Sequence, residues 1–377
     1  MKPRDYQLEA VEWALRKRQS IICMPTGTGK TLIAALWIKH LLKDGKVKKV
    51  LVLEPTRFLV EQTSRFLKRL GIPAEPVHGS MSRGARRRGW SSLVVVATPE
   101  IVESEGFNVM DEPGAIVVDE CHHTTGQDSY VTVARRYRAE WRLGLTAYLP
   151  PSRRRMLEDY IGEARCWSWT DPRLAKYIPE WVGEVYEAPL NKAEERLYTR
   201  LEELWDKLHG VERVVIGNAL RWLVRDGAIA LRESYEKGGL LSRLLEPVRE
   251  LLYSREVRPA HKLPTLVRIL RDHEGYEKAI VFVDRVIVAE LVSKSLRSLE
   301  PALILGRRRI NPRISLEKAK RTRLIISTSA GEEGIDLPEA DLLIIWSHTA
   351  SPLRFIQRLG RILRPSRAKQ KTAVFIA

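Results

Sequence analysis

Short apolar runs recur along both halves of the chain, and they constrain its fold more than any other feature. In the first half they include Val50–Leu53, Leu93–Val96 and Ile116–Val118, and in the second half Ala279–Val283 and Leu324–Ile326. The runs are rich in β-branched residues, and helix-length amphipathic stretches separate them. This alternation predicts parallel α/β sheets, because a parallel strand is reached through a crossover that is usually a helix.

The middle of the chain has a different pattern. From about residue 190 to 256, leucines recur at three- and four-residue spacings, as in Leu197, Leu201, Leu204 and Leu208, and glycines interrupt them. We therefore predict an α/β protein with two tandem parallel-sheet domains and a helical insertion between them. The predicted domains are residues 1–150 and 259–377, with a linker and the insertion at 151–258.

A glycine-containing loop stands between an apolar run and a helix-like stretch near the N-terminus. It follows Ser20–Met24 and consists of Pro25, Thr26, Gly27, Thr28, Gly29, Lys30 and Thr31. The glycines let backbone N–H groups point at phosphates, the following helix directs its positive end at them, and Lys30 adds a charge. Thr31 would hold Mg²⁺ through its hydroxyl. The loop predicts a nucleoside triphosphate site, although Met24 stands where the Walker A pattern has its first glycine.

Two acids follow another apolar run directly. Gly114–Val118 leads into Asp119 and Glu120, at what we expect to be the carboxyl end of a buried parallel strand, where open α/β sheets bind ligands. Asp119 can coordinate Mg²⁺, and Glu120 can polarise the water that attacks the γ-phosphate. Acids at strand ends are often only solvated, but together with the upstream loop they predict hydrolysis.

A basic segment near the C-terminus is the third element. Within Gln357–Arg364, Arg361 and Arg364 lie on the same face of an expected helix at spacing i, i+3. Such guanidinium groups could neutralise charge on a transferred phosphoryl group. The alternative is a basic solvated helix.

These three segments resemble motifs I, II and VI of superfamily 2 helicases and translocases: PTGTGKT, DECH at Asp119–His122, and QRLGRILR. Further segments resemble the remaining motifs in the expected order. The resemblance implies two RecA-like domains, ATP and Mg²⁺ as cofactors, and a nucleic-acid-dependent ATP hydrolase. It assigns Arg4 and Gln7 to the adenine, Gly334 and Asp336 to the nucleotide, and Gln357 with His122 to sensing the state of the cleft between the sheets. It assigns to the nucleic-acid backbone the residues Thr56, Arg57, Thr98 and Thr328.

Two branches of that superfamily compete. His122-His123 and the segment from Phe355 to Pro365 resemble the XPB branch of DNA translocases, whereas the segment from Asp119 to Val131 and Gly331–Asp336 resemble the archaeal Hef and Fanconi M branch. Tyr148 and Leu149 depart from both, and the chain has no Arg-Glu-Asp tripeptide of the XPB type. The choice between the branches stays open.

A formal charge of +17 points to a polyanionic partner. Basic clusters occur at 83–88, 153–155, 307–309 and 318–323, where they could neutralise backbone phosphates, although each one singly is better explained as a solvated face. We expect DNA rather than RNA, and an ATP-dependent motor that moves on or unwinds forked or branched DNA in repair or replication-fork processing. The alternatives are a duplex-stimulated RNA helicase and a double-strand DNA translocase that does not separate strands. A non-motor binding module is disfavoured because the catalytic acids and both arginines are present.

The insertion mixes basic and aromatic residues, including Trp205, Arg221, Trp222 and Arg225. They could form a clamp that grips a duplex. The simpler interpretation, which we prefer, is that both tryptophans pack in a small helical core.

The remaining expectations concern the setting of the protein. No segment approaches the ~20 apolar residues that span a bilayer, and no signal-like stretch begins the chain, so we expect a cytoplasmic, nucleoid-associated protein. Abundant arginine and glutamate with only four asparagines favour a thermophilic prokaryote as its source. The chain ends at Ala377 just after its last expected strand, so a nuclease or regulatory function would come from a protein partner. Cys23, Cys121 and Cys166 form no CxxC pair and are interpreted as small neutral residues rather than metal ligands or disulfides.

Overall fold

The computed structural model divides the chain into two units, which are described separately. Unit 1 is Met1–Ile178 with Pro352–Gly360, and unit 2 is Pro179–Ser351 with Arg361–Ala377. The structure describes all residues except 1, 112, 124–128, 138, 306–311, 329–336, 348–354, 356–357 and 361–370. No helix among the described residues is long and apolar enough to cross a membrane.

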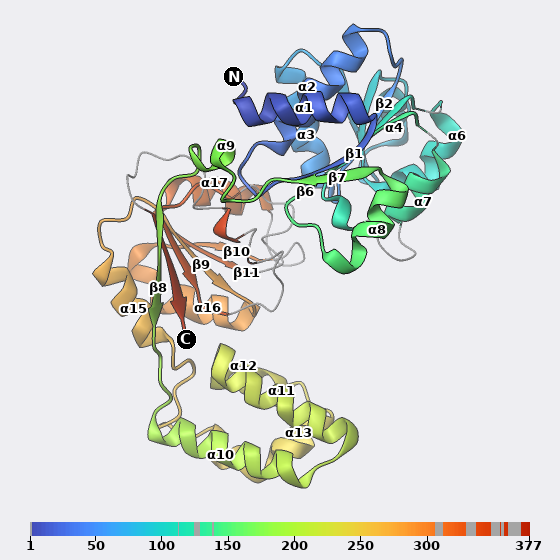
Figure 1. The fold of residues 1–377 in the computed structure, drawn as a ribbon. Helices are drawn as coiled ribbons and strands as arrows, with labels where there is room; N and C mark the ends of the chain where they lie inside the picture. The colour runs from blue at the N-terminus through green and yellow to red at the C-terminus, as the bar shows by residue number, and fades with distance from the viewer. Residues whose placement is uncertain are drawn as a thin grey trace. The chain divides into compact units, whose positions relative to one another are not determined.

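Unit 1 contains a parallel sheet of seven strands in the order β3-β4-β2-β5-β6-β1-β7 (Figure 1). Its central strands are fully buried runs such as VLVL in β2 and AIVV in β5, which is why they read as continuous apolar segments. The strands are β1 (Gln19–Cys23), β2 (Val50–Leu53), β3 (Ala74–Val77), β4 (Val94–Ala97), β5 (Ala115–Val118), β6 (Trp141–Thr146) and β7 (Glu163–Cys166).

The helices of unit 1 connect successive strands, except for α1, which precedes β1, and α9, which follows β7. They are α1 (Asp5–Lys17), α2 (Lys30–Lys43), α3 (Arg57–Arg69), α4 (Arg83–Trp90), α5 (Pro99–Ile101), the π-helix η1 (Val102–Gly106), α6 (Phe107–Val109), the 3-10 helix η2 (Cys121–His123), α7 (Ser129–Arg136), α8 (Pro151–Tyr160) and α9 (Pro172–Ala175). The sheet separates two hydrophobic cores, because alternate side chains of a strand point to opposite faces. Ile22 belongs to the core that α1 and α2 cover, whereas Ile21 belongs to the core on the other face.

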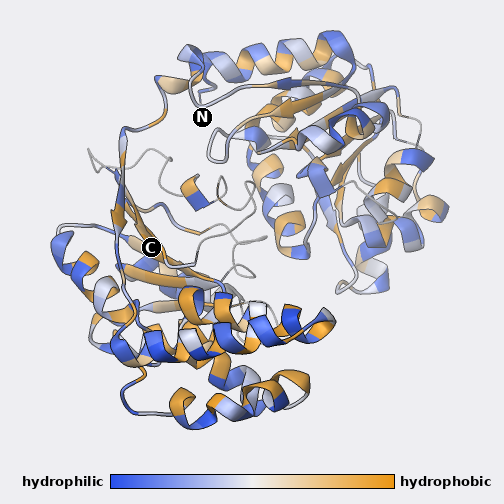
Figure 2. Ribbon diagram, turned by 60° about the horizontal axis from the view of Figure 1, so that its bottom comes forward, coloured by the Kyte–Doolittle hydropathy of each residue, from blue (hydrophilic) through white to orange (hydrophobic). Residues whose placement is uncertain are grey.

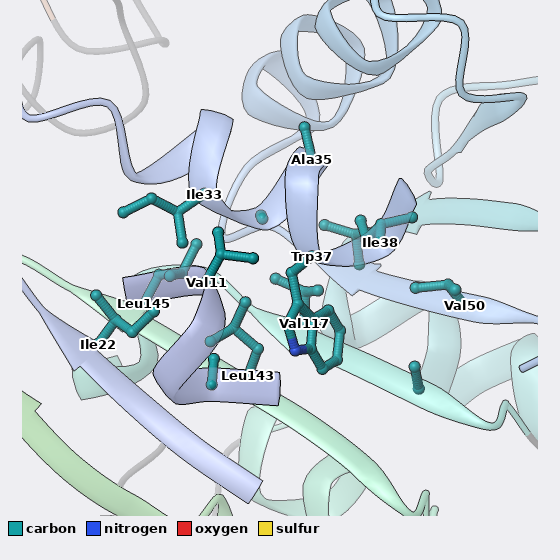
Figure 3. Close-up of a cluster of buried hydrophobic side chains, with 14 of the residues drawn as sticks. Val11, Ile22, Ile33, Ala35, Trp37, Ile38, Val50, Val117, Leu143 and Leu145 are labelled. Atoms are coloured by element: carbon teal, nitrogen blue, oxygen red, sulfur yellow. The ribbon is translucent and has the colours of Figure 1, made fainter. Parts of the chain in front are cut away.

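The first of these cores is shown in Figure 3. Trp37 and Ile38 of α2 and Val11 of α1 pack in one core with the strand residues Val50, Val117 and Leu143. All of these side chains are buried. Helix α2 is thereby fixed to the strands, and so is the loop that precedes it.

Unit 2 contains a second parallel sheet, of six strands in the order β10-β11-β9-β12-β13-β8. Its strands are orange in the hydropathy colouring of Figure 2, and the helices around them carry mixed colours. The strands are β8 (Trp181–Tyr186), β9 (Ala279–Val283), β10 (Ala302–Ile304), β11 (Leu324–Thr328), β12 (Leu342–Ile345) and β13 (Lys371–Ile376). The predicted fold class, with two tandem parallel-sheet domains, is confirmed.

Two groups of helices belong to unit 2. Those beside the sheet are α15 (Leu263–Asp272), α16 (Val286–Ser295), the 3-10 helix η4 (Arg297–Leu299) and α17 (Pro312–Arg321). Those of the helical insertion are α10 (Lys192–Lys207), α11 (Gly210–Asp226), α12 (Ala228–Glu236), α13 (Leu240–Leu245), the 3-10 helix η3 (Glu246–Val248) and α14 (Arg249–Leu252). The insertion has its own core, which includes Leu197, Leu201, Leu223 and Leu231.

The structure differs from the predicted boundaries between residues 151 and 258. This segment was expected to be a linker and an insertion between the domains, but β7 pairs with β1 of the first sheet and β8 pairs with β13 of the second. The helices at 192–252 therefore interrupt unit 2 rather than separate the two sheets. Both strands lie at a sheet edge, so they are partly exposed and lack the continuous apolar run that marked the central strands.

An ionic cluster joins the insertion to the second sheet. Asp226, at the end of α11, has no solvent exposure. Its Oδ2 lies 2.7 Å from Nη2 of Arg225 and 3.3 Å from Nε of Arg285, which follows β9. Its Oδ1 accepts a hydrogen bond of 3.1 Å from the hydroxyl of Ser347. Since an unpaired buried carboxylate is costly, these partners fix the insertion against the second sheet.

The same cluster bears on the predicted clamp. The guanidinium of Arg285 lies 4.2 Å from the ring centre of Trp222, and Arg213 lies 3.9 Å from that of Trp205. Both tryptophans also pack, half-buried, against the core of the insertion. These contacts support the interpretation that the tryptophans are structural.

Candidate active site

The order of the strands in unit 1 brings five loops to one edge of the sheet. Because the strands are parallel, their carboxyl ends meet at the same edge. The last residues are aligned in register: Ala97 of β4 beside Leu53 of β2, Leu53 beside Val118 of β5, and Cys23 of β1 beside Thr146 of β6. The predicted phosphate loop, the acid pair and the predicted nucleic-acid residues of unit 1 all follow these ends.

The phosphate loop follows β1, and side chains of α1 donate hydrogen bonds to its backbone. Gly27 and Gly29 adopt left-handed conformations with φ of 86° and 79°, which favour glycine. The hydroxyl of Tyr6 and Nε2 of Gln7 both donate hydrogen bonds of 2.8 Å to the carbonyl of Thr28. A Cβ on Gly29 would lie only 2.5 Å from Nε2 of Gln7. Gln7 therefore supports the shape of the loop.

Lys30 begins α2, so its backbone is at the positive end of that helix. Its Nζ donates hydrogen bonds to the carbonyls of Met24, at 3.0 Å, and Pro25, at 3.4 Å. The positive charge of Lys30 opposes the rise that burial causes in the pKa of Asp119. Thr31 follows at the second position of the helix and is half-buried.

Asp119 and Glu120 leave the end of β5 in a constrained conformation. Glu120 has a positive φ of 49°, and its N–H donates a hydrogen bond of 2.9 Å to Oδ1 of Asp119. Burial, together with the negative charge of the neighbouring Glu120, raises the pKa of Asp119 to about 7. A positive φ outside glycine costs about 1 kcal/mol or more, and such strain is found often at functional sites.

His122 connects the acid segment to β6. Its Nδ1 lies 3.0 Å from Oγ1 of Thr146, and that hydroxyl donates to the carbonyl of Tyr148 at 2.8 Å. The proton of the hydroxyl is therefore engaged, so Nδ1 of His122 is the donor. Burial lowers the pKa of His122 to about 3, so the ring is neutral, and its contact of 3.4 Å with Oε2 of Glu120 is not an ion pair.

The donor set fits a magnesium nucleotide. Thr31 and Asp119 offer the oxygen ligands that Mg²⁺ takes, and Mg²⁺ usually binds through one or two carboxylates together with phosphates. Within the described residues, no group of three or more His, Cys, Asp and Glu side chains could hold a metal ion without such help. Thr26 Oγ1 and His122 Nε2 are buried and have no hydrogen-bond partner among those residues, as expected for groups that meet a polar ligand.

Glu54 is a third acid at this edge, and the sequence analysis missed it. It follows β2, is 1% exposed, and accepts a hydrogen bond of 2.6 Å from the hydroxyl of Thr63. Burial raises its pKa well above the usual value, and the charge of Asp119 contributes. The signal was available, because Glu54 directly follows an apolar run just as Asp119 does.

The predicted nucleic-acid residues of unit 1 follow β2 and β4. Oγ1 of Thr56 accepts a hydrogen bond of 3.3 Å from the N–H of Leu59 at the start of α3, and Arg57 is the first residue of that helix. Thr98 is buried and precedes α5. In unit 2, Thr328 ends β11, and its buried Oγ1 has no hydrogen-bond partner within the described part of the chain.

The remaining predicted site residues are Arg4 and five residues that the structure does not describe. The guanidinium of Arg4 lies 4.8 Å from the ring centre of Tyr177, and the backbone N–H of Arg4 donates a hydrogen bond of 2.9 Å to Oε1 of Gln7. Five residues lie outside the described part of the structure, and their assignments stay predictions: Gly334, Asp336, Gln357, Arg361 and Arg364.

Comparison with known families matches the two halves of the chain separately. Residues 1–150 match the family described as "Type III restriction enzyme, res subunit", and residues 261–366 match "Helicase conserved C-terminal domain". These ranges contain the two sheets apart from the strands β7, β8 and β13, and they leave out the helical insertion.

Two curated relatives are similar over nearly the whole chain. The DNA 3'-5' translocase XPB2 of Sulfurisphaera tokodaii is 28% identical, and the match covers 99% of this chain and 80% of the relative. A protein of Methanocaldococcus jannaschii named as an ATP-dependent RNA helicase is 27% identical over 97% of this chain. The chain spans about half the length of that second protein, 56%.

A solved structure supports the fold. The crystal structure of the Pyrococcus furiosus Hef helicase domain matches all of this chain and 95% of its own, with a TM-score of 0.64 and 23% sequence identity. Both branches that the sequence suggested are thus represented among the similar proteins.

Proposed function

We propose that the chain is a superfamily 2 motor, which hydrolyses ATP and uses the energy to move along DNA or to unwind it, since its two halves match the res-subunit and helicase C-terminal families. The observation that carries the proposal is the edge of the first sheet, where the phosphate loop, the acid pair and the hydroxyls of Thr56 and Thr98 follow aligned strand ends. In this proposal, the ATP site and the strand contacts of unit 1 share one sheet.

The proposed chemistry follows from the residues at that edge. Lys30 and the N–H groups of the loop bind the phosphates, and Glu120 orients and deprotonates the attacking water. Thr31 and Asp119 would hold Mg²⁺, which supplies charge neutralisation at the phosphates when it is bound. Arg361 and Arg364 are proposed to stabilise the charge that develops on the transferred phosphoryl group.

Contacts to the nucleic acid are proposed for Thr56, Arg57, Thr98 and Thr328. Hydroxyl, guanidinium and N–H groups of this kind bind phosphate and sugar, and they carry no base information. A motor that translocates needs such sequence-independent contacts. The net charge of +17 supports the polyanionic partner.

The first test is the steady-state ATPase rate with no nucleic acid, single-stranded DNA, forked duplex DNA and matched RNAs at low salt. We expect the largest stimulation from forked DNA. Glu120→Gln should lower the stimulated rate at least about 100-fold, as loss of a general base does. Glu12→Gln, a change of the same kind at an exposed position of α1, is the matched control. An unaltered rate in the Glu120 variant would disprove the proposed chemistry.

An RNA-dependent ATPase is the second candidate, because one similar protein is named as an RNA helicase. Stimulation by RNA above that by matched DNA would favour it. A strand-displacement assay on forked DNA separates the remaining possibilities: product strands indicate a helicase, whereas ATP hydrolysis on duplex without displacement indicates a translocase. DNA repair is the process we propose for either DNA motor.

A further inference from the structure

Two cysteines far apart in the sequence meet at the end of strand β1. Cys23 is the last residue of β1 and Cys166 is the last residue of β7, and the two are paired in register. Neighbouring strands lie about 4.8 Å apart, which is within the Cα separation of about 4.4–6.8 Å that disulfides use. In-register residues of parallel strands project from the same face of the sheet, so the two thiols are neighbours.

The two thiols are not equivalent. Cys166 is exposed, whereas Cys23 is buried. A hydrogen bond between the side chains lowers the pKa of Cys166 to about 7, and the nearby guanidinium of Arg154 also lowers it. The same hydrogen bond, together with burial, raises the pKa of Cys23. An accessible thiolate beside a second thiol is the arrangement found in cysteines that respond to oxidants.

The surroundings hold the pair in place. The N–H of Trp167 donates a hydrogen bond of 2.9 Å to the carbonyl of Cys23, so the two strand ends remain paired beyond the cysteines. The ring of Trp167 packs edge-to-face against Trp13, with ring centres 6.3 Å apart. Arg154 is itself fixed, because its Nη2 donates to the carbonyl of Ala164 at 3.2 Å. These contacts hold the two strand ends, and with them the two cysteines, side by side.

The position of Cys23 connects this pair to the nucleotide site. Cys23 is followed directly by Met24 and Pro25, whose carbonyls accept the hydrogen bonds of Lys30. A covalent link at Cys23 would therefore restrain the point where the phosphate loop leaves the strand. We propose that Cys166 and Cys23 form a reversible disulfide on reaction with a peroxide, and that the disulfide weakens nucleotide binding by the phosphate loop.

The chemistry balances with a peroxide as the oxidant. The thiolate of Cys166 attacks one oxygen of hydrogen peroxide, the O–O bond breaks, and the released hydroxide takes a proton to become water. Cys166 is then a sulfenic acid. The sulfur of Cys23 loses its proton and displaces the hydroxyl as a second water, which forms the S–S bond. Two thiols thus give two electrons to the peroxide, and a dithiol reductant reverses the change.

The test begins with the thiols alone. The full chain is reduced, exposed to hydrogen peroxide, blocked with N-ethylmaleimide and mapped by mass spectrometry without reduction. We expect a linked peptide pair containing Cys23 and Cys166, which dithiothreitol removes. Cys121 is fully buried and should stay reduced, so Cys121→Ser should still form the link. Cys166→Ser should leave Cys23 reduced. Oxidation of Cys166 to the sulfinic acid with Cys23 still reduced would overturn the proposal.

The second measurement is binding of a fluorescent ATP analogue to the reduced and the oxidised protein. We expect the dissociation constant to rise about five-fold or more on oxidation, and to recover with dithiothreitol. An unchanged constant in fully linked protein would overturn the effect on the loop. This half rests on the proposed function, whereas the peptide map does not. Failure of the reduced protein to bind the analogue would count against the nucleotide site and leave the disulfide result intact.

Discussion

Gly29 and Gln7 constrain each other at the phosphate loop. Gly29 has a positive φ, and a Cβ there would collide with the amide of Gln7 that supports the carbonyl of Thr28. We expect Gly29→Ala to weaken ATP binding at least about ten-fold and to lower the free energy of unfolding by about 1–3 kcal/mol, the cost of a non-glycine residue in this conformation. Nucleotide titration and urea unfolding measure the two effects.

The control is Gly275→Ala, since no atom lies within 4 Å of the Cβ position at Gly275. This change should alter neither quantity by more than about 0.5 kcal/mol, as expected of a surface substitution. Equal behaviour of the two alanine variants would contradict the role of Gly29.

His122 makes stability depend on pH. Its folded pKa of about 3 is below the unfolded value of 6.5, so below pH 6.5 the unfolded chain binds a proton that the folded chain does not. The free energy of unfolding therefore falls as the pH falls toward 3, by up to about 1.4 kcal/mol per pH unit. His261, with a pKa of about 4, acts in the same direction.

Urea unfolding at pH 7.5 and 5.5 tests this expectation. Between these values the parent should lose about 1 kcal/mol more than His122→Gln does. His40→Gln, at a half-exposed position paired with Asp44, is the comparison and should keep the pH dependence of the parent. A parent-like pH dependence in the His122 variant would refute the assignment.

At the level of elements, the ionic cluster around Asp226 determines how the insertion is attached. Asp226→Ala leaves Arg225 and Arg285 without their shared buried partner. Breaking a buried ion pair in this way costs about 3–5 kcal/mol, and we expect a loss of that size in urea unfolding. Glu203→Ala removes the exposed pair with Arg200 in the same insertion and should cost about 1 kcal/mol or less. Similar losses in both variants would show that the cluster does not stabilise unit 2.

The elements also show what the sequence could predict. Central strands such as β2 and β5 are buried on both faces, so they appear in the sequence as continuous apolar runs. From such runs, a parallel sheet covered on both faces could be predicted. Edge strands β7 and β8 could not, because EARC and WVGEVY contain polar residues and are partly exposed. The boundary of the insertion was misplaced because these two strands were not recognised in the sequence.

Most of the candidate site could be predicted from which residues follow one another in the sequence. The phosphate loop and acid pair were identified because each follows an apolar run directly. The support of Thr28 by Tyr6 and the meeting of Cys23 with Cys166 depend on contacts between distant segments, which no pattern within one segment contains.

For the whole molecule, the excess of positive charge predicts binding that weakens steeply with salt. A protein that neutralises about 6–10 phosphates loses about 10³–10⁵ in affinity between 50 and 200 mM salt. We expect the affinity for forked DNA, measured by fluorescence anisotropy, to fall by a factor in this range between the same two salt concentrations. Arg57→Ala should reduce the slope of log affinity against log salt by about 1, as expected for one lost phosphate contact.

Arg200→Ala is the matched control, because Arg200 already pairs with Glu203 on the insertion. Its slope should equal that of the parent. A slope of log affinity against log salt near zero for the parent would contradict the expectation that the protein binds DNA through its phosphates.

The two ends of the helical insertion meet where they leave the second sheet. Asn191 donates a hydrogen bond of 2.8 Å to the carbonyl of Glu256, and Arg258 pairs with Glu194 at 2.7 Å. A segment whose entry and exit are adjacent can be lengthened, shortened or exchanged without altering the order of the strands around it. The insertion is therefore the natural place for relatives with the same two sheets to diverge, and for an engineer to graft a different module onto them.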